Sequence, residues 1–454
     1  MAKFTRIIFK NHLFLYPMNY FDVIGTFFKN PVDSRPLEGV RVIEFAHYIL
    51  GPNIPRLLAQ LGAEVVKVEP PPRGDRWKYA SMWGGRGFFK GMRIDYLYLN
   101  SNKYFLGLDF RSEKGRELML ELVKRADIFV ENMEPGTLDR YGLGYLQLRE
   151  VNPRLIYVSA SGYGQFGPLH RLPSYDIIGQ AESGIMDTTG WEEGEVNELY
   201  RLPDYPGDWL PSTMAVSAVI AALIHRVKSG RGQYIDLSQA ASLQRFMYHF
   251  VYMSATGRRM GRSGFFDPFA VVSGVFKTAD GKFVAVAAMT ERQAKALAEV
   301  VPGLAEAVGD KWRSYKALAE WVAKKTLGDV LDVCKKLGVP AQPVMNDFDV
   351  VSDPWRWERG SVVKIVDRLY GEIVVPGPVV KMAGVDLGVK WVARPVGYHN
   401  KLVLKKWLGY GAEEVDELVK KGVLGYWDGQ IGNTPPPGWR AEDDPVYLGE
   451  RDEV

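Results

Sequence analysis

The sequence predicts an α/β fold with a twisted parallel sheet and a separate, smaller α+β unit. Between residues 37 and 160, short apolar runs alternate with segments whose apolar residues recur at helical spacing. This alternation is typical of a parallel sheet that helices cover on both faces. After about residue 262 the pattern changes to a hairpin followed by helices. The 454-residue chain is also too long for one ordinary core, because domains usually span about 100–200 residues.

Strand and helix patterns alternate in order along the first part of the chain. Apolar runs predict strands at residues 40–45, 64–68, 104–108, 128–131 and 155–160. Helical periodicity predicts helices at residues 54–61, 112–125 and 145–150. Gly62 ends the first helix and Ser112 caps the second. Ligands of such sheets bind beyond the carboxyl ends of the strands, so we expect the chemistry in the loops that follow them. These loops cover residues 47–51, 69–76, 132–140 and 162–168.

The rest of the chain adds one more helix and strand, then the α+β unit. An apolar helix is predicted from about residue 212 to 228, a strand at 234–237 and a long helix to about 255. A hairpin is predicted at 271–276 and 283–288, with its turn at Asp280-Gly281. Thr290 and Gln293 have capping-box spacing and begin a helix to about 301. Further helices are predicted at 315–325, 329–337 and 412–421.

These patterns divide the chain into successive segments. They are an N-terminal extension (1–36), the first part of a large domain (37–261), a small α+β domain (262–350), a linker and return to the large domain (351–425), and a C-terminal tail (426–454). Three prolines at 435–437 and many acidic residues predict that this tail is extended.

Composition excludes several classes of protein. A net charge of +3 with 24% charged residues does not indicate a nucleic-acid scaffold or a polybasic membrane surface, although the slight excess of cations suits an anionic ligand. Cys334 is the one cysteine, which excludes an intramolecular disulfide and fits a reducing compartment. The six histidines lack ligand spacing, so we predict no metal site. The longest uncharged run, 209–225, is shorter than the roughly 20 residues of a membrane span, and we expect a cytoplasmic protein.

Asp208 is the candidate nucleophile, because it stands where the apolar run 214–224 is about to begin. A carboxylate in that position is most often a first-turn acid that offsets the helix dipole, and this alternative stays open on position alone. Gly162 to Gly167 matches G-x-G-x-x-G, but Pro168 and more loop follow it, so we reject a dinucleotide-binding fingerprint. Its glycines are expected to let the backbone approach a ligand closely.

Short motifs from residue 37 to 424 occur in a recognisable order. They are Leu37-Glu38-Gly39-Val40-Arg41-Val42-Ile43-Glu44, Gly51-Pro52, Leu61-Gly62-Ala63-Glu64 with Val68-Glu69-Pro70, Asn102-Lys103, Leu108-Asp109, Glu131-Asn132 with Pro135-Gly136, Gly162-Tyr163-Gly164-Gln165 with Gly167-Pro168, Gly207-Asp208, and Lys228-Ser229-Gly230-Arg231-Gly232-Gln233. Their order and spacing resemble the family III CoA-transferases, the formyl-CoA and carnitine CoA-transferase group. The resemblance implies a Rossmann-like large domain, a small inserted α+β domain, and two chains interlocked as a homodimer.

The resemblance also implies a reaction. Members of this family move coenzyme A from an acyl-CoA donor to a free carboxylic acid through covalent intermediates on an aspartate, and Asp208 matches that position. A carboxylate that attacks a thioester gives a mixed anhydride, which CoA thiolate then converts to an aspartyl-CoA thioester. No metal and no nucleotide redox cofactor are needed. The enzyme must exclude water and stabilise oxyanions, tasks for Gly162, Gly164, Gly167, Gly261 and Gly264.

Residues that match the family's CoA contacts lie mainly in the loops after the strands. They are Tyr48, Ile49, Leu50, Leu108, Arg111, Asn132, Met133, Arg140 and Tyr141. Arg111 and Arg140 would bind phosphates by charge-assisted hydrogen bonds, and their alternative is a solvated surface cation. Pro71, Pro72 and Pro173 stand where some members carry a basic residue, so those contacts are in doubt.

Two alternatives to CoA transfer remain. The α-methylacyl-CoA racemases of the same superfamily need a His-Asp pair as acid and base, whereas the matching residues here are Tyr175-Asp176. Tyr is a poor substitute, because its phenol has a pKa of about 10. Asp176 either stabilises a loop or hydrogen-bonds the anhydride. The second alternative is a CoA-binding scaffold without turnover, and the retained Gly207-Asp208 argues against it.

Specificity for the acids exchanged is expected to depend on Tyr175, Trp209 and residues 257–268.

Overall fold

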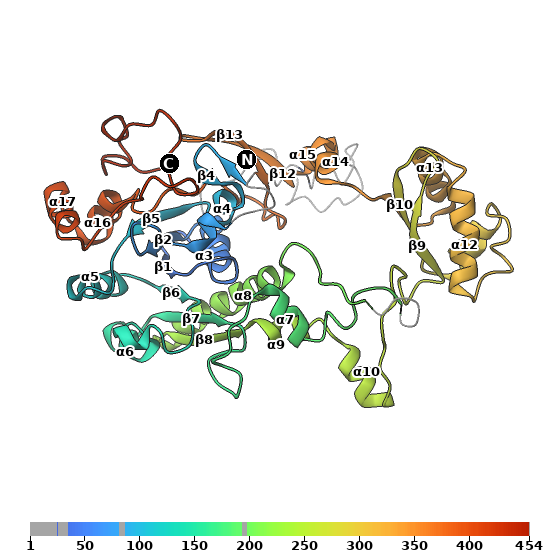
Figure 1. The fold of residues 1–454 in the computed structure, drawn as a ribbon, viewed down its shortest axis with the longest axis horizontal. Helices are drawn as coiled ribbons and strands as arrows, with labels where there is room; N and C mark the ends of the chain where they lie inside the picture. Colours follow the sequence, from blue (N-terminus) through green and yellow to red (C-terminus); the bar gives the residue numbers. More distant parts are fainter. Residues whose placement is uncertain (1–24, 26–34, 81–86, 193–197, 454) are drawn as a thin grey trace, which may run out of the picture. The chain divides into compact units, whose positions relative to one another are not determined.

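The computed structural model describes residues 25, 35–80, 87–192 and 198–453, which form two compact units (Figure 1). The first unit contains the described residues up to Ala160, then Ser212–Asp236 and the chain from Arg359 onward. The second contains the described residues of Ser161–Pro211 and Leu237–Glu358. Most of the predicted N-terminal extension, residues 1–24 and 26–34, lies outside the described residues.

A six-stranded sheet organises the first unit. In spatial order its strands are β5 (Lys103–Gly107), β2 (Glu64–Glu69), β1 (Arg41–Phe45), β6 (Ile128–Glu131), β7 (Ile156–Ser161) and β8 (Gln233–Ser238). The pairings from β5 through β7 are parallel, which confirms the predicted parallel sheet. Strand order reverses between β1 and β6, so this pair marks the topological switch point where ligands of open α/β sheets bind.

Helices cover this sheet because both of its faces are apolar. Val42, Ile43 and Val66 have no exposed surface, and Ile43 pairs with Val66 on one side and with Phe129 on the other. The helices of the first unit include α3 (Leu50–Gln60), α4 (Ile94–Leu99), α5 (Glu113–Val123), α6 (Tyr145–Val151), α16 (Asn400–Leu408) and α17 (Ala412–Lys420). Ser112 caps α5 as predicted, since its Oγ accepts a hydrogen bond from Gly115 N.

The long helix α8 (Pro206–Ser229) begins among residues of the second unit and continues into the first. By length and composition it is apolar enough to cross a membrane, and it is the one such helix among the described residues. Polar contacts tie it to the first unit: Asn53 Nδ2 donates to Ser212 Oγ at 2.6 Å, and Arg226 Nη2 lies 2.8 Å from Asp127 Oδ1. These contacts and the buried Val219 are typical of a helix that packs on protein.

The second unit contains a three-stranded antiparallel sheet with its own core. Its strands are β9 (Val272–Lys277), β10 (Phe283–Ala288) and β11 (Ala341–Pro343), and its helices include α11 (Glu291–Ala298), α12 (Lys311–Val322) and α13 (Leu327–Leu337). The capping box of Thr290 and Gln293 is present as predicted. Cys334 is buried in this core. The domain boundaries at 262 and 350 stay predictions.

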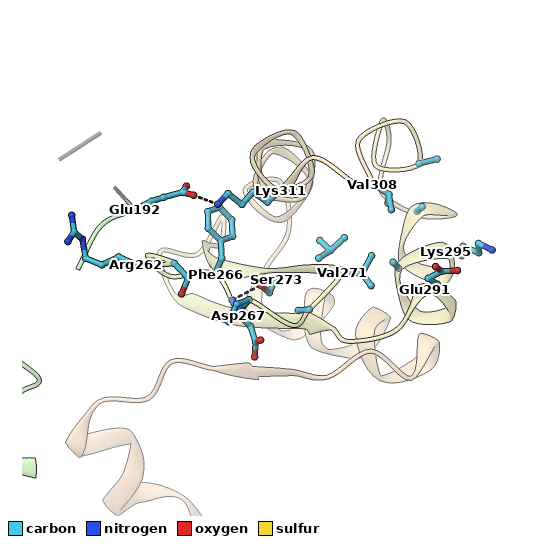
Figure 2. Close-up of a pocket in the computed structure, with 18 of the residues that line it drawn as sticks. Glu192, Arg262, Phe266, Asp267, Val271, Ser273, Glu291, Lys295, Val308 and Lys311 are labelled. Carbon is cyan, nitrogen blue, oxygen red and sulfur yellow. Dashed lines mark hydrogen bonds and ion pairs between the residues drawn. The ribbon is translucent and has the colours of Figure 1, made fainter. Parts of the chain in front are cut away.

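A cavity of about 1150 Å³ lies beside this small sheet (Figure 2). Residues 260–268 line one part of it, and α11 and the start of α12 line another. Glu192 forms an ion pair with Lys311 at its margin and accepts a hydrogen bond from Trp312 Nε1. The cavity therefore has an apolar floor with charged residues around it.

One predicted helix is interrupted. The chain after β8 forms α9 (Gln239–Gln244) and α10 (His249–Thr256) instead of a single helix to about 255. Between them, residues 245–247 donate to carbonyls three positions back, the pattern of a tight turn. The remaining elements are α7 (Asp176–Glu182), α14 (Asp347–Ser352), α15 (Pro354–Arg359), β3 (Phe88–Phe89), β4 (Met92–Arg93), β12 (Val362–Asp367) and β13 (Gly371–Pro376), with short 3₁₀ turns at Arg76–Tyr79, Asp139–Tyr141 and Ala441–Asp443.

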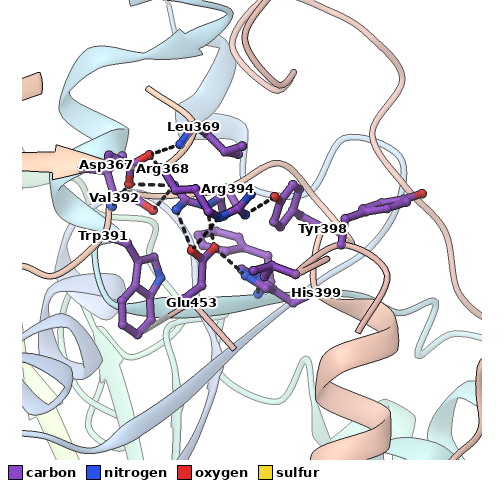
Figure 3. Close-up of polar contacts among 12 residues, drawn as sticks. Asp367, Arg368, Leu369, Trp391, Val392, Arg394, Tyr398, His399 and Glu453 are labelled. Atoms are coloured by element: carbon purple, nitrogen blue, oxygen red, sulfur yellow. Dashed lines mark hydrogen bonds and ion pairs between the residues drawn. The ribbon is translucent and has the colours of Figure 1, made fainter. Parts of the chain in front are cut away.

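The prediction that the C-terminal tail is extended is wrong, because the segment packs on the first unit: Val446 is fully buried, and Asp444 and Glu453 pair with Arg368 and Arg394. Glu453 is bound by Arg394 through two hydrogen bonds of 2.7 and 2.9 Å and contacts His399 Nε2 at 3.0 Å (Figure 3). Asp444 accepts hydrogen bonds from Arg368 and Trp439. Composition cannot show these pairings, in which attraction to the buried Arg394 and the partly buried Arg368 offsets the repulsion between acids.

Replacing Glu453 with Gln is expected to destabilise the first unit by about 3 kcal/mol at neutral pH, because Arg394 loses a buried partner. Burial alone would raise the pKa of Glu453, but Arg394 and His399 hold it well below its ordinary value. The stabilisation is therefore present above the unfolded pKa of about 4.3 and lost at lower pH. Urea unfolding at pH 7 and at acid pH measures this difference. The exposed Glu450→Gln is the control, and equal stability of the two variants would contradict the prediction.

Candidate active site

Asp208 lies in the first turn of α8, after a backbone turn with unusual geometry. Asp204 and Tyr205 have φ angles of +59° and +58°, the left-handed region that non-glycine residues rarely adopt. Tyr205 O accepts hydrogen bonds from Asp208 N and Trp209 N at 3.0 and 3.1 Å. Two consecutive strained residues cost of order 1–3 kcal/mol each. Such strain directly before a candidate nucleophile is typical of functional sites.

The carboxylate of Asp208 is held by an amide that sequence reasoning missed. Gln239 Nε2 donates to Asp208 Oδ1 at 2.6 Å. Burial and then the charge of Asp176 raise the pKa of Asp208 to about 7, while this hydrogen bond acts in the opposite direction. A carboxyl group with a pKa raised this far is typical of functional sites.

Asp176 fixes the backbone next to the nucleophile. It is the first residue of α7 and is 4% exposed. Its Oδ1 accepts from Gly207 N and its Oδ2 from Gln180 Nε2, both at 2.7 Å, and Arg201 lies 3.9 Å away. A Cβ on Gly207 would come within 2.7 Å of Asp176 Oδ1, so this position requires glycine. The loop-stabilising role of Asp176 is thus visible, while a role in chemistry stays a prediction.

Ser174 and Gly179 hold the amide of Gln239 in place. Ser174 Oγ donates to Gln239 Oε1 at 2.8 Å, and a Cβ on Gly179 would come within 2.7 Å of the same oxygen. Gly162 in turn leaves room for Ser174, whose Cβ would lie 2.2 Å from a Cβ at position 162. For Gly162 the structure therefore gives a packing reason within the protein. Gln239 directly follows β8, but its hydrogen bond to Asp208 depends on contacts between distant loops that the sequence pattern does not show.

The residues considered for racemase chemistry do not form a His-Asp pair. Tyr175 is the residue before α7 and is 59% exposed. His170 is engaged in its own loop, with Nδ1 at 2.7 Å from Gly167 O and Nε2 at 3.3 Å from Arg171 Nε. The local structure thus gives His170 a structural role.

The predicted CoA-contact residues lie in the first unit, and two of their segments meet at the switch point. Asn132, after β6, accepts a hydrogen bond from His47 N at 2.9 Å and donates to His47 O at 2.8 Å. His47 directly precedes Tyr48, Ile49 and Leu50, so these contacts bring the loop after β1 against the loop after β6. A Cβ on Gly51 would lie 2.7 Å from Asn132 Cγ, which explains the glycine there.

Buried charges support both loops. Lys67 Nζ, with no exposed surface, binds Glu44 Oε1 and Ala46 O, both at 2.7 Å, at the end of β1. Tyr48 has a φ of +61°, and its N donates to Asp75 Oδ1 at 3.1 Å. After β6, Glu131 Oε2 accepts from Met133 N at 2.7 Å, and burial raises the pKa of Glu131 to about 7.

The other predicted CoA contacts differ in exposure. Leu108 is fully buried, so its side chain belongs to the core. Arg111 is exposed and bound to Asp109, with Nε 2.6 Å from Oδ1. Arg140 is exposed and donates to Thr137 Oγ1 at 3.2 Å, and Tyr141 packs edge-on against Phe110. Both arginines are thus at the surface, but an anionic ligand of Arg111 would have to compete with Asp109, to which Arg111 donates from Nε and from Nη2.

Two further observations concern a possible metal site and the cavity of Figure 2. No group of three or more His, Cys, Asp or Glu side chains is arranged to hold a metal ion in the described part of the chain. The cavity of Figure 2 contains residues predicted to set specificity, Met260 to Pro268, but Asp208, Asp176 and Gln239 are not in its lining.

The parallel sheet and the loops at its switch point define an α/β protein whose first unit has the ligand-binding edge typical of open parallel sheets. The model of CoA-transferase family III matches residues 37–400. The chain belongs to this family and is a CoA-transferase, which confirms the resemblance found in the sequence motifs.

Curated relatives carry the names of CoA-transferases that use carboxylic acids. Succinyl-CoA–D-citramalate CoA-transferase of Chloroflexus aurantiacus is 31% identical over 86% of this chain and 98% of that protein. The human succinyl-CoA:glutarate CoA-transferase is 32% identical over 86% of this chain and 90% of that protein. Acetyl-CoA:oxalate CoA-transferase of Acetobacter aceti is 32% identical over 77% of this chain and 90% of that protein.

Solved structures have the same fold. A CAIB/BAIF family protein from Brucella suis matches with a TM-score of 0.72 and 29% identity, covering 83% of this chain and all of that chain. Rv3272 from Mycobacterium tuberculosis matches with a TM-score of 0.65 and 25% identity, covering 82% of this chain and 99% of that chain.

The raised pKa of Asp208 predicts how activity depends on pH. Below about pH 7 the side chain carries a proton and is a poor nucleophile, so kcat/KM should rise with pH and level off above 7. Asp176→Asn removes the like charge that helps to raise this pKa, and should move the midpoint to lower pH. Initial rates between pH 5 and about pH 9 test both statements. Asp332→Asn, an exposed carboxylate of α13, is the control. A midpoint that stays in place in Asp176→Asn would refute the electrostatic coupling.

Proposed function

We propose that this enzyme transfers CoA from an acyl-CoA donor to a free carboxylic acid, with Asp208 as the covalent nucleophile. The observation that carries the proposal is the carboxylate of Asp208 itself, held by Gln239 at the start of α8 with a pKa of about 7. A carboxylate suits this reaction, because its acyl derivatives have energies similar to those of the substrates, and each exchange is reversible without ATP.

The proposed reaction proceeds in balanced steps. An oxygen of Asp208 bonds to the thioester carbonyl carbon, the C–S bond breaks, and CoA thiolate leaves with the electron pair. The thiolate then bonds to Cγ of Asp208, and the donor acid leaves as a carboxylate, which gives an aspartyl-CoA thioester. An acceptor carboxylate attacks this thioester, and the same two steps run in reverse to give the new acyl-CoA.

We propose that the switch-point loops of the first unit hold the CoA carrier. Tyr48, Ile49 and Leu50 would contact it through the backbone segment that Asn132 and Asp75 fix. Arg111 and Arg140 would exchange Asp109 and Thr137 for phosphate oxygens. Leu108, Met133 and Tyr141 would supply apolar contact beside them. Gly167, with a positive φ, remains a candidate backbone donor in the second unit, whereas Gly164 N already donates to Ser161 Oγ at 3.0 Å.

The acids exchanged are proposed to be small carboxylates. The relatives named above act, by their names, on citramalate, glutarate and oxalate with succinyl-CoA or acetyl-CoA as donor. Arg262 belongs to residues 257–268, which are expected to set specificity, and this cation fits recognition of an anionic acid. Succinyl-CoA and acetyl-CoA are therefore the donors to test with a panel of mono- and dicarboxylates.

The proposal also covers the oligomeric assembly of the protein and its location in the cell. All side chains of α10 are at least partly exposed, and Phe250, Val251 and Met253 are among the exposed ones. We propose that a second copy of the chain covers such apolar surface in an interlocked homodimer. The one cysteine, Cys334, is buried and unpaired, which fits a reducing cytoplasm.

A trapping experiment tests the nucleophile. The enzyme is incubated with succinyl-CoA or acetyl-CoA and then with hydroxylamine, which should convert Asp208 to a hydroxamate that peptide mass spectrometry detects. Asp208→Asn should lose this product, and its transfer rate should fall by at least about 1000-fold. The exposed Asp332→Asn should keep both.

The same samples distinguish CoA transfer from racemisation and from CoA binding without turnover. Deuterium incorporated from heavy water at the α-carbon of the acyl group, with no hydroxamate, would indicate a racemase. Absence of both signals would indicate a CoA-binding scaffold. Transfer by Asp208→Asn at the parent rate would remove Asp208 from the mechanism.

A further inference from the structure

A buried amide faces one oxygen of the proposed nucleophile. Gln239 is 2% exposed and is the first residue of α9. Its Nε2 donates to Asp208 Oδ1 at 2.6 Å, a short and therefore strong hydrogen bond. The amide reaches this position although the two residues are 31 positions apart, because β8 ends beside the loop that follows β7: Ala240 N donates to Gly162 O.

The orientation of the amide is fixed by its other end. Ser174 Oγ donates to Gln239 Oε1 at 2.8 Å, so Nε2 is the end that faces Asp208. A reversed amide would place Oε1 against the carboxylate oxygen, which is repulsive when Asp208 is charged. Gly179 closes the space around the amide, since a Cβ there would lie within 2.7–2.9 Å of three Gln239 atoms.

We propose that Gln239 is a catalytic residue that keeps Oδ1 of Asp208 out of the reaction and stabilises the charge that develops on it. This inference rests on the proposed function. With Oδ1 held, Oδ2 is the oxygen that attacks the acyl-CoA carbonyl and becomes the bridging oxygen of the anhydride. When CoA thiolate attacks Cγ, the electron pair of the carbonyl moves onto Oδ1, where the N–H of Gln239 is already directed. Ser174 is the positioning residue that keeps the amide in this orientation.

Because the two oxygens of Asp208 have different roles, only one of them is exchanged with the substrates in each reaction cycle. Collapse of the tetrahedral intermediate breaks the Cγ–Oδ2 bond, so the donor acid leaves with Oδ2, and the thioester retains Oδ1. The acceptor carboxylate then bonds to Cγ through one of its own oxygens. When the thiolate attacks the acceptor carbonyl carbon, the acyl C–O bond breaks and that oxygen stays on Asp208. Each full cycle therefore replaces one oxygen of Asp208 and leaves the other in place.

Oxygen-18 labelling tests this directly. The enzyme turns over many times with succinyl-CoA and excess succinate labelled in both carboxyl groups, and in parallel with acetyl-CoA and labelled acetate. Peptide mass spectrometry then counts the label on Asp208. We expect one oxygen-18 atom in the parent and two in Gln239→Leu, where the carboxylate rotates between cycles. Ser174→Ala should give a mixture. Gln244→Leu, an exposed glutamine of the same helix, should match the parent.

The outcomes are distinct. Two labels in the parent, or one label in Gln239→Leu, would overturn the inference while leaving covalent catalysis by Asp208 intact. No label with either pair would overturn the proposed function and the inference with it. If Gln239→Leu does not fold, the parent count and Ser174→Ala still decide the question.

Rates give a second measurement. Loss of one oxyanion donor usually lowers kcat by about 100-fold to 1000-fold, and we expect a decrease in this range for Gln239→Leu with little change in KM for the acyl-CoA. More of the acyl-aspartyl anhydride should be trapped by hydroxylamine, because the step that slows is the attack of CoA thiolate on Cγ of Asp208, which consumes the anhydride. A variant with parent kcat would show that the hydrogen bond serves structure alone.

Discussion

The hydrogen bond from Gly207 N to Asp176 is the contact on which the geometry of the candidate site depends. It is buried and 2.7 Å long, and it requires a glycine at position 207, because a Cβ there would lie 2.7 Å from Asp176 Oδ1. It holds the chain directly before Asp208 after two residues in left-handed conformation. Asp176 thus acts twice, as a backbone anchor and as a like charge that raises the pKa of its neighbour. Because Asp176 has both roles, we expect the protein to tolerate few substitutions at this position.

Much of the fold could be predicted from the sequence, because buried parallel strands are continuous apolar runs bounded by capping residues. Asp208 could be proposed from its place at the start of an apolar helix and from the motifs around it. Gln239 and Ser174 could not, since their hydrogen bonds join residues 31 and 65 positions apart and depend on how three loops meet. The packed C-terminal segment was missed for a similar reason. An acid-rich composition gives no sign of Arg394, a buried cation of the preceding segment that pairs with Glu453.

The two sets of functional residues differ in how they are fixed. In the second unit, the neutral amide of Gln239 donates to Asp208, and the hydroxyl of Ser174 orients that amide, so both set orientation without adding charge. In the first unit, fully buried ion pairs such as Lys67 with Glu44 stabilise the ends of strands, and their loops follow. Buried pairs are costly to desolvate but define geometry when every partner is satisfied. Charge therefore supports the scaffold around the loops proposed to bind CoA, while the proposed nucleophile Asp208 has a neutral hydrogen-bond partner and a pKa raised to about 7.

The two hydrogen bonds between Asn132 and the backbone of His47 have a consequence for the order in which the protein folds. The two residues are 85 positions apart and belong to loops after strands that are neighbours in space. During synthesis, the chain that contains β1, α3 and β2 emerges long before Asn132, so the loop at Tyr48 lacks its partner until β6 docks. Formation of such non-local parallel pairs is slow. The loop at Tyr48, one of the proposed CoA contacts, therefore gains its Asn132 partner only after β6 has joined the sheet.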